Sequence, residues 1–110
     1  DIFVGDLISH NSTYTNSKAV YYFNSDQFER PLIVRPFKQG DRIYLPGMEH
    51  AKKVSRIFID EKVPVEERHR LPVITNEDEI VVVGSLRHSK KVSKSKRPFD
   101  NCVILIRDNS

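Results

Sequence analysis

Lysine and arginine are the residues of this chain whose types and spacing could do chemistry, and that chemistry is the binding of phosphate. A turn at Pro46–Gly47 leads into a predicted helix that begins near His50, with Lys52 and Lys53 in its first turn. Free backbone N–H groups at a helix start attract an anion, whereas lysines there oppose the helix dipole. We therefore expect a phosphate beside these lysines. The alternative is that they only solvate an exposed face.

More basic residues flank this turn, and a second basic stretch follows. The flanking residues are Arg35, Lys38, Arg42, Lys62, Arg68 and Arg70. The second stretch has no acidic residue from Ile80 to Phe99 and contains Arg87, Lys90, Lys91, Lys94, Lys96 and Arg97. Such a local concentration of positive charge attracts a polyanion. The alternative for this second stretch is a mobile, solvated loop.

The net charge of +3 for 110 residues hides this asymmetry, because acidic residues such as Glu77, Asp78 and Glu79 offset the basic stretches. Lysine and arginine contacts to phosphate grip a nucleic-acid backbone without reading its sequence. The run Tyr21–Phe23 is expected in the core and at its rim rather than as an exposed platform for stacking bases. The pattern favours a module that binds a nucleic-acid backbone.

Catalysis by this chain alone is not expected. The histidines are spread along the chain with no pair at metal-binding spacing, and no cysteine pair completes a zinc site; they are His10, His50, His69 and His88. The adjacent carboxylates at 60–61 and 66–67 suit helix capping and salt bridges better than acid–base work. The chain also has no glycine-rich phosphate loop and no nucleophile elbow. We therefore predict no catalytic residues and no metal site.

Composition places the chain among folded domains outside the membrane. Hydrophobic residues make up 38% of the chain, and no apolar run approaches the ~20 residues of a membrane span. The single cysteine, Cys102, cannot form an internal disulfide, which fits a cytoplasmic location, and its apolar neighbours predict a buried, inert thiol. The chain begins at Asp1 rather than Met, so we expect a piece of a longer protein.

The hydrophobic pattern predicts one mainly β domain over residues 1–110, barrel-like or a sandwich, with about seven short strands. The expected strands are Ile2–Ile8, Lys18–Phe23, Leu32–Arg35, Arg42–Leu45, Val73–Thr75, Glu79–Val83 and Asn101–Arg107. Residues 9–17 are expected to form a hairpin connection or a loose loop. An amphipathic helix of about three turns is expected from His50 to Lys62, followed by a further turn after Pro64.

An ordered set of short segments resembles a known family. The segments are Arg35–Arg42, Gly47–Met48, Lys52–Val54, Phe58–Pro64, Glu67–Arg68 and Leu71–Val73. In this order they resemble the C-terminal domain of bacterial tRNA(Ile)-lysidine synthases, and the similarity covers residues 24 to about 106.

The resemblance implies both a fold and a role for the chain. The fold would be similar to a mostly β domain of the phenylalanyl-tRNA synthetase β subunit. The full enzyme uses ATP, with magnesium, to join lysine to the wobble cytidine of an isoleucine tRNA with a CAU anticodon. Its catalytic domain is N-terminal and has a Ser-Gly-Gly-x-Asp-Ser loop, which this chain lacks. The segment here would bind the tRNA, with the acceptor stem as its expected target.

The family's basic positions correspond to Arg35, Arg42, Lys52, Lys53, Lys62 and Arg68, which we predict to bind RNA. We add Lys90, Lys91, Lys94 and Arg97 from the second stretch, which is less clearly a family feature. The alternative role is a structural or protein-interaction domain that braces the catalytic half or a homodimer without touching RNA. A free-standing small enzyme is the third and least favoured interpretation.

Overall fold

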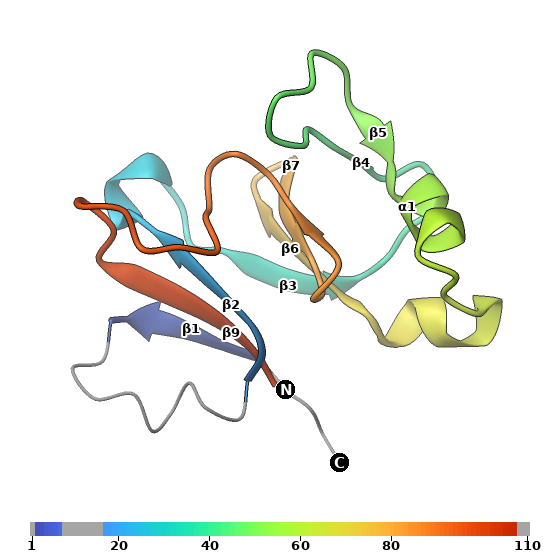
Figure 1. The fold of residues 1–110 in the computed structure, drawn as a ribbon, viewed down its shortest axis with the longest axis horizontal. Coiled ribbons are helices and arrows are strands. Elements are labelled where there is room, and N and C mark those ends of the chain that lie inside the picture. The colour runs from blue at the N-terminus through green and yellow to red at the C-terminus, as the bar shows by residue number, and fades with distance from the viewer. Residues whose placement is uncertain (1, 8–16, 108–110) are drawn as a thin grey trace. The chain divides into compact units, whose positions relative to one another are not determined.

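The strand β9 (Cys102–Arg107) is central to a three-stranded antiparallel sheet, between β1 (Ile2–Asp6) and β2 (Ser17–Phe23) (Figure 1). The computed structural model describes residues 2–7 and 17–107. Every residue of β9 from Cys102 to Ile106 is buried. The continuous apolar run predicted this burial, and the prediction is confirmed.

The connection between β1 and β2 is not that of a hairpin. Both strands pair with β9 and not with each other, because β9 takes the place between them. The hairpin alternative for residues 9–17 was therefore wrong. Residues 9–16 of that segment, which include His10, lie outside the described residues.

On its other side β2 is joined by an isolated bridge to the segment before β9. The backbone N–H of Tyr22 donates to the carbonyl of Ser93 at 2.7 Å, and Ser93 returns the bond at 2.9 Å. After β2 a short 3-10 helix, η2 (Ser25–Gln27), begins with Asn24 as its N-cap. Tyr21 and Phe23 are buried and Tyr22 is half-buried, as the sequence predicted.

The middle of the chain forms a four-stranded antiparallel sheet in the order β3 (Ile33–Pro36), β6 (Pro72–Asn76), β7 (Glu79–Val83) and β8 (Arg87–His88). The predicted hairpin is confirmed, with Glu77 and Asp78 as its two-residue turn and Glu77 at a φ of 56°. The predicted strand between Pro31 and Pro36 is an edge strand, as prolines favour.

A third sheet has two strands, β4 (Arg42–Ile43) and β5 (Lys52–Lys53), and β5 lies directly before helix α1 (Val54–Asp60). The prediction of a helix from His50 was therefore wrong at its start. Lys52 and Lys53 pair with β4, and Lys53 is extended at a ψ of 132°. Since neither lysine lies in a helical turn, the expected phosphate at a helix start loses its structural basis.

The predicted turn after Pro64 is present as a 3-10 helix, η3 (Val65–Arg70). Glu66 and Glu67 lie in its first turn, where the helix dipole favours acidic residues. None of the helices in the described part of the chain is long and apolar enough to cross a membrane.

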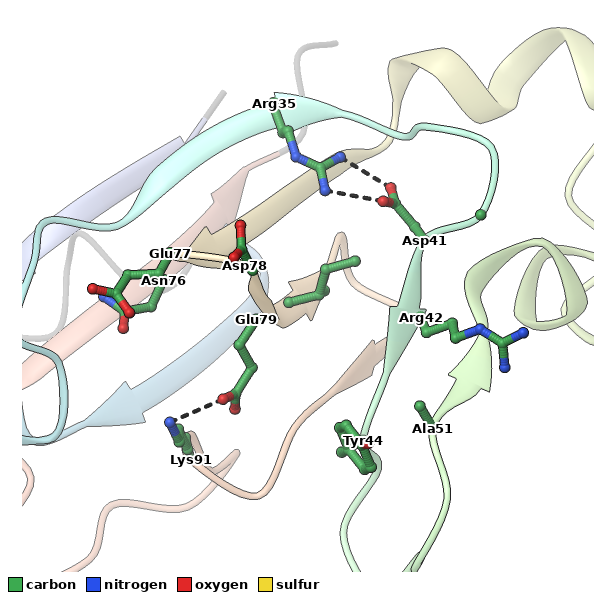
Figure 2. A pocket seen from close by; sticks show the side chains of 12 residues that line it. Arg35, Asp41, Arg42, Tyr44, Ala51, Asn76, Glu77, Asp78, Glu79 and Lys91 are labelled. Atoms are coloured by element: carbon green, nitrogen blue, oxygen red, sulfur yellow. Dashed lines mark hydrogen bonds and ion pairs between the residues drawn. The ribbon is translucent and has the colours of Figure 1, made fainter.

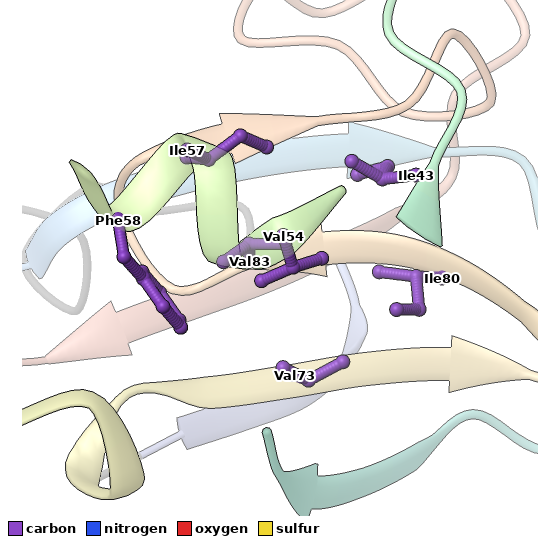
Figure 3. Packing of buried hydrophobic residues seen from close by; sticks show 7 residues of the cluster. All are labelled: Ile43, Val54, Ile57, Phe58, Val73, Ile80 and Val83. Atoms are coloured by element: carbon purple, nitrogen blue, oxygen red, sulfur yellow. The ribbon is translucent and has the colours of Figure 1, made fainter. Parts of the chain in front are cut away.

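One side of α1 packs on this part of the fold through a buried apolar cluster (Figure 3). The cluster consists of Ile43, Val54, Ile57, Phe58, Val73, Ile80 and Val83. The rings of Phe37 and Phe58 meet edge to face, with centroids 5.0 Å apart. This spacing is favourable for aromatic pairs, so the cluster holds α1 and β4 on the hairpin.

Contacts group the chain into two units, one of Asp1–Glu29 with Val92–Ser110 and one of Arg30–Lys91. The mainly β class is confirmed, although the described strands form three separate sheets rather than a closed barrel. The short strands β5 and β8 and the helix η2 were not predicted. The single-domain organisation stays a prediction.

The packing of α1 yields a prediction with a matched control. Ile57 is 1% exposed and Ile59 is 55% exposed. We expect Ile57→Ala to lower the free energy of unfolding by about 2–5 kcal/mol, because it leaves a cavity in the core. Ile59→Ala should cost less than about 1 kcal/mol. Urea unfolding measures both; equal losses would contradict the packing of α1.

Candidate functional site

Asp41 joins three parts of the chain around the start of β4. Its carboxylate oxygens accept hydrogen bonds from the two terminal nitrogens of Arg35, at 2.9 and 3.0 Å (Figure 2). One of these oxygens also accepts the backbone N–H of Lys38 at 2.8 Å. The carbonyl of Asp41 accepts the N–H of Val54 at 2.9 Å. One residue therefore closes the turn before β4 and fixes the beginning of α1.

The environment of Asp41 favours its charged form. Burial raises the pKa of the carboxyl, but the hydrogen bonds from Arg35 and the Lys38 backbone, together with the positive charges of Arg35 and Lys38, outweigh burial, so the pKa lies below its usual value of 3.8. The side chain of Arg35 is 23% exposed. The structure thus places Arg35, a predicted RNA contact, in a bidentate ion pair within the chain.

Arg42 and Lys53 lie directly opposite each other across β4 and β5. Both side chains are exposed, and neither makes a hydrogen bond or ion pair with another described residue. Like charges at directly opposed positions of an antiparallel pair are destabilising. An anion bound beside them would remove this repulsion. The structure thus brings together two of the predicted RNA contacts.

Lys62 follows α1 in a conformation that suits glycine better than lysine. Its φ is 58°, in the left-handed region, which costs a residue with a Cβ about 1–2 kcal/mol. The N–H of Lys62 donates to Ile59 and that of Val63 to Phe58, the bond pattern of a Schellman motif. Its exposed side chain makes no hydrogen bond or ion pair within the described chain.

Two other residues predicted to contact RNA, Lys52 and Arg68, interact with groups of the chain itself. The Lys52 ammonium lies 2.7 Å from a carboxylate oxygen of Asp60. The Nε of Arg68 donates to the carbonyl of Val63 at 3.2 Å, and its guanidinium lies 5.7 Å from the centroid of the Phe58 ring. Arg68 therefore helps to hold the turn after α1.

The second basic stretch is also partly neutralised. Arg87 pairs with Glu61, Lys91 with Glu79 at 3.1 Å, and Arg97 with Asp100 at 2.9 Å. Two of these carboxylates, Glu61 and Glu79, lie before the stretch in the sequence, so the sequence window that defined the stretch did not contain them. Lys90 and Lys94 are exposed.

The basic surplus belongs to one of the two units. The unit of Arg30–Lys91 has thirteen Lys and Arg against nine Asp and Glu, whereas the other unit has five against six. The stretch from Arg87 to Arg97 is divided between the units after Lys91. Positive charge is therefore concentrated on the part that contains β4, β5 and α1.

Tyr44, for which the sequence predicted no role, lines a pocket beside Arg42 and is 52% exposed. The alternation of side chains along a strand could have indicated this exposure. Ile43 is 1% exposed, so the side chains of its neighbours Arg42 and Tyr44 must point to the opposite face.

The prediction for Cys102 is confirmed: the thiol is free and buried, and burial, with Asp6 nearby, raises its pKa. No metal-binding cluster of His, Cys, Asp and Glu is found among residues 2–7 and 17–107.

Comparisons with known proteins agree on one family. The model described as the TilS substrate C-terminal domain matches residues 32–99. The tRNA(Ile)-lysidine synthase of Bacillus subtilis is 39% identical over 80 residues, which cover 72% of this chain and 17% of that protein. The enzyme of the same name from Caldanaerobacter subterraneus is 34% identical over 97 residues, covering 88% of this chain and 21% of that protein.

A crystal structure of a TilS C-terminal domain superposes with a TM-score of 0.75 at 24% identity, covering 99% of this chain and 82% of that one. This likeness supports the same fold. The chain spans about a fifth of the length of the two curated relatives just described.

The ion pair of Asp41 predicts a specific dependence of stability on pH. Because the folded-state pKa lies below the unfolded value, the pair stabilises the fold above pH 3.8, and this contribution is lost as the pH falls through the folded pKa. We expect the wild type to lose more stability than Asp41→Asn between about pH 5 and about pH 3. Urea unfolding at both pH values measures this. Parallel losses in the two proteins would contradict the prediction.

Proposed function

The chain belongs to the family of TilS C-terminal domains, and we propose that it binds tRNA and positions it for a tRNA(Ile)-lysidine synthase whose catalytic part lies outside this chain. The main support for this proposal is the pair Arg42 and Lys53. These two exposed cations lie opposite each other on β4 and β5 and have no partner among the described residues. Lys62 adds a third such cation just after α1. Unpaired cations of this kind suit the phosphates of an RNA backbone.

The proposed mechanism is positional rather than chemical. Contacts from lysine and arginine to phosphates fix the orientation of a nucleic acid without reading its bases. The domain would hold the tRNA body, with the acceptor stem as the proposed target, while the catalytic domain ligates lysine to the wobble cytidine. ATP and magnesium would belong to that domain, because this chain has no Ser-Gly-Gly-x-Asp-Ser loop to hold them. We also propose a cytoplasmic location, which suits a free cysteine.

One observation favours a second candidate function, the bracing of the catalytic half or of a dimer. Ile33 and Val34 are 56% and 46% exposed on the edge strand β3. Exposed edges with apolar side chains are suited to pairing with another protein segment. Deleting this domain from the full enzyme separates the candidates. Loss of tRNA affinity with a stable remainder supports RNA binding, whereas an aggregated or monomeric remainder supports bracing.

We expect Arg42→Gln with Lys53→Gln to weaken tRNA binding by the full enzyme by about tenfold at low salt. The slope of log affinity against log salt should become shallower by about two, because each lost phosphate contact contributes roughly one. Filter binding across a salt series measures both quantities. Lys18→Gln, an exposed lysine of the other unit, is the control. An unchanged slope in the double variant contradicts the proposed contacts.

Lys62 allows stability and binding to be separated. Lys62→Gly should raise the free energy of unfolding by about 1 kcal/mol, because glycine adopts a φ of 58° without strain. Lys62→Gln should leave stability nearly unchanged. Both variants should bind tRNA more weakly, since both lose the ammonium. If the glycine variant is more stable but binds tRNA as tightly as the wild type, the proposed contact of Lys62 with RNA is contradicted.

A further inference from the structure

A pocket of about 570 Å³ lies between β4 and the turn of the β6–β7 hairpin (Figure 2). Figure 2 shows Arg42 and Tyr44 on the side of β4, with Glu77, Asp78 and Glu79 on the opposite side. All of its lining residues belong to the unit of Arg30–Lys91. The volume falls within the range of about 300–1,000 Å³ that is typical of small-ligand sites.

The charges around this pocket are mostly satisfied within the chain. Three ion pairs account for them: Arg35 with Asp41, Lys91 with Glu79, and Arg30 with Glu77. Among the charged lining residues, only the side chains of Arg42 and Asp78 make no hydrogen bond or ion pair with another described residue. Arg42 and Asp78 are therefore the charged lining residues left for a ligand by the described part of the chain, and Figure 2 shows the Arg42 guanidinium extending from β4 away from Asp78, at the rim of the pocket.

Tyr44 provides a flat apolar surface in the same pocket. Tyr44 is 52% exposed, and no residue in the described part of the chain stacks on its ring. An exposed aromatic ring beside basic residues is the usual arrangement for stacking an unpaired base. Tyr44 also comes two residues after Arg42, so the sheet presents both from β4 and the turn that follows it.

We propose that this pocket binds one unpaired nucleotide of the RNA. Its base stacks on Tyr44, an exocyclic amino group of the base donates to Asp78, and its phosphate lies at Arg42 beside Lys53. A carboxylate accepts from the amino group of cytosine, adenine or guanine, whereas uracil has no such group. The proposal rests on RNA binding by this domain, and it adds a site for single-stranded nucleotides to a surface that otherwise contacts only backbone.

Charge complementarity favours a nucleotide over other small ligands. The ligand must bring a negative group to the Arg42–Lys53 pair, a hydrogen-bond donor to Asp78 and a flat ring to Tyr44. A nucleotide with an amino-bearing base supplies all three. A free amino acid supplies the two charged groups, and it is included as a competing probe in the test.

The test measures binding of three probes to the 110-residue chain: a short oligocytidylate, an oligouridylate of equal length, and a blunt RNA duplex. We expect the wild type to bind all three and to prefer oligocytidylate to oligouridylate. Tyr44→Leu should weaken oligocytidylate binding by roughly fivefold or more, and by more than it weakens duplex binding. Tyr44→Phe, which keeps the ring, should retain most of the affinity. Asp78→Asn should reduce the preference for cytidine.

Each result distinguishes the pocket from the wider surface. Equal losses of oligocytidylate and duplex binding in Tyr44→Leu would overturn the pocket while leaving backbone binding in place. Equal wild-type affinity for oligocytidylate and oligouridylate would overturn the role of Asp78. Failure of the wild type to bind even the duplex would overturn the RNA-binding function itself. Displacement of the oligonucleotide by free lysine, but not by cytidine monophosphate, would assign the pocket to an amino acid.

Discussion

The proposed RNA surface depends on one carboxylate, that of Asp41. The two carboxylate oxygens accept hydrogen bonds from Arg35 and from the backbone N–H of Lys38. The backbone carbonyl of Asp41 accepts the N–H of Val54, the first residue of α1. These bonds close the turn on one side of β4 and position β5 on the other. The register that sets Arg42 opposite Lys53 follows from this arrangement. Asp41 thus determines where Arg42 and Lys53, the cations of the proposed RNA surface, are placed.

The cations of this chain divide into two groups with different roles. Arg35, Lys52 and Arg68 are held by Asp41, Asp60 and a backbone carbonyl, respectively. Arg42 and Lys53 are exposed and have no such partner among the described residues. A surface pair contributes little to stability, whereas the bidentate, largely buried pair of Arg35 organises a turn. The number of basic residues therefore overstates the number available to a polyanion, and the distinction needs three-dimensional partners.

Features that depend on local pattern could be predicted from the sequence. The β6–β7 hairpin, the proline-flanked edge strand and the buried strand β9 each follow from alternation, turn residues or a continuous apolar run. The extended state of Lys52 and Lys53 could not be predicted in this way, because their partners lie about ten residues earlier. The partners of Arg87 and Lys91 were missed for the same reason. Tyr44 was missed because one exposed aromatic residue, although alternation places it away from the core face, does not by itself indicate a binding site.

The order of strands in the chain has a consequence for biosynthesis. The unit of Arg30–Lys91 is continuous in sequence, so a ribosome delivers all of it before β9 is made. The other unit needs β9 as the strand between β1 and β2. During synthesis β1 and β2 remain without their partner strand β9 while about eighty further residues are translated, at rates of roughly 5–20 residues per second. The basic unit should therefore fold first, and the nascent strands β1 and β2 should be the part most exposed to misfolding and to chaperones.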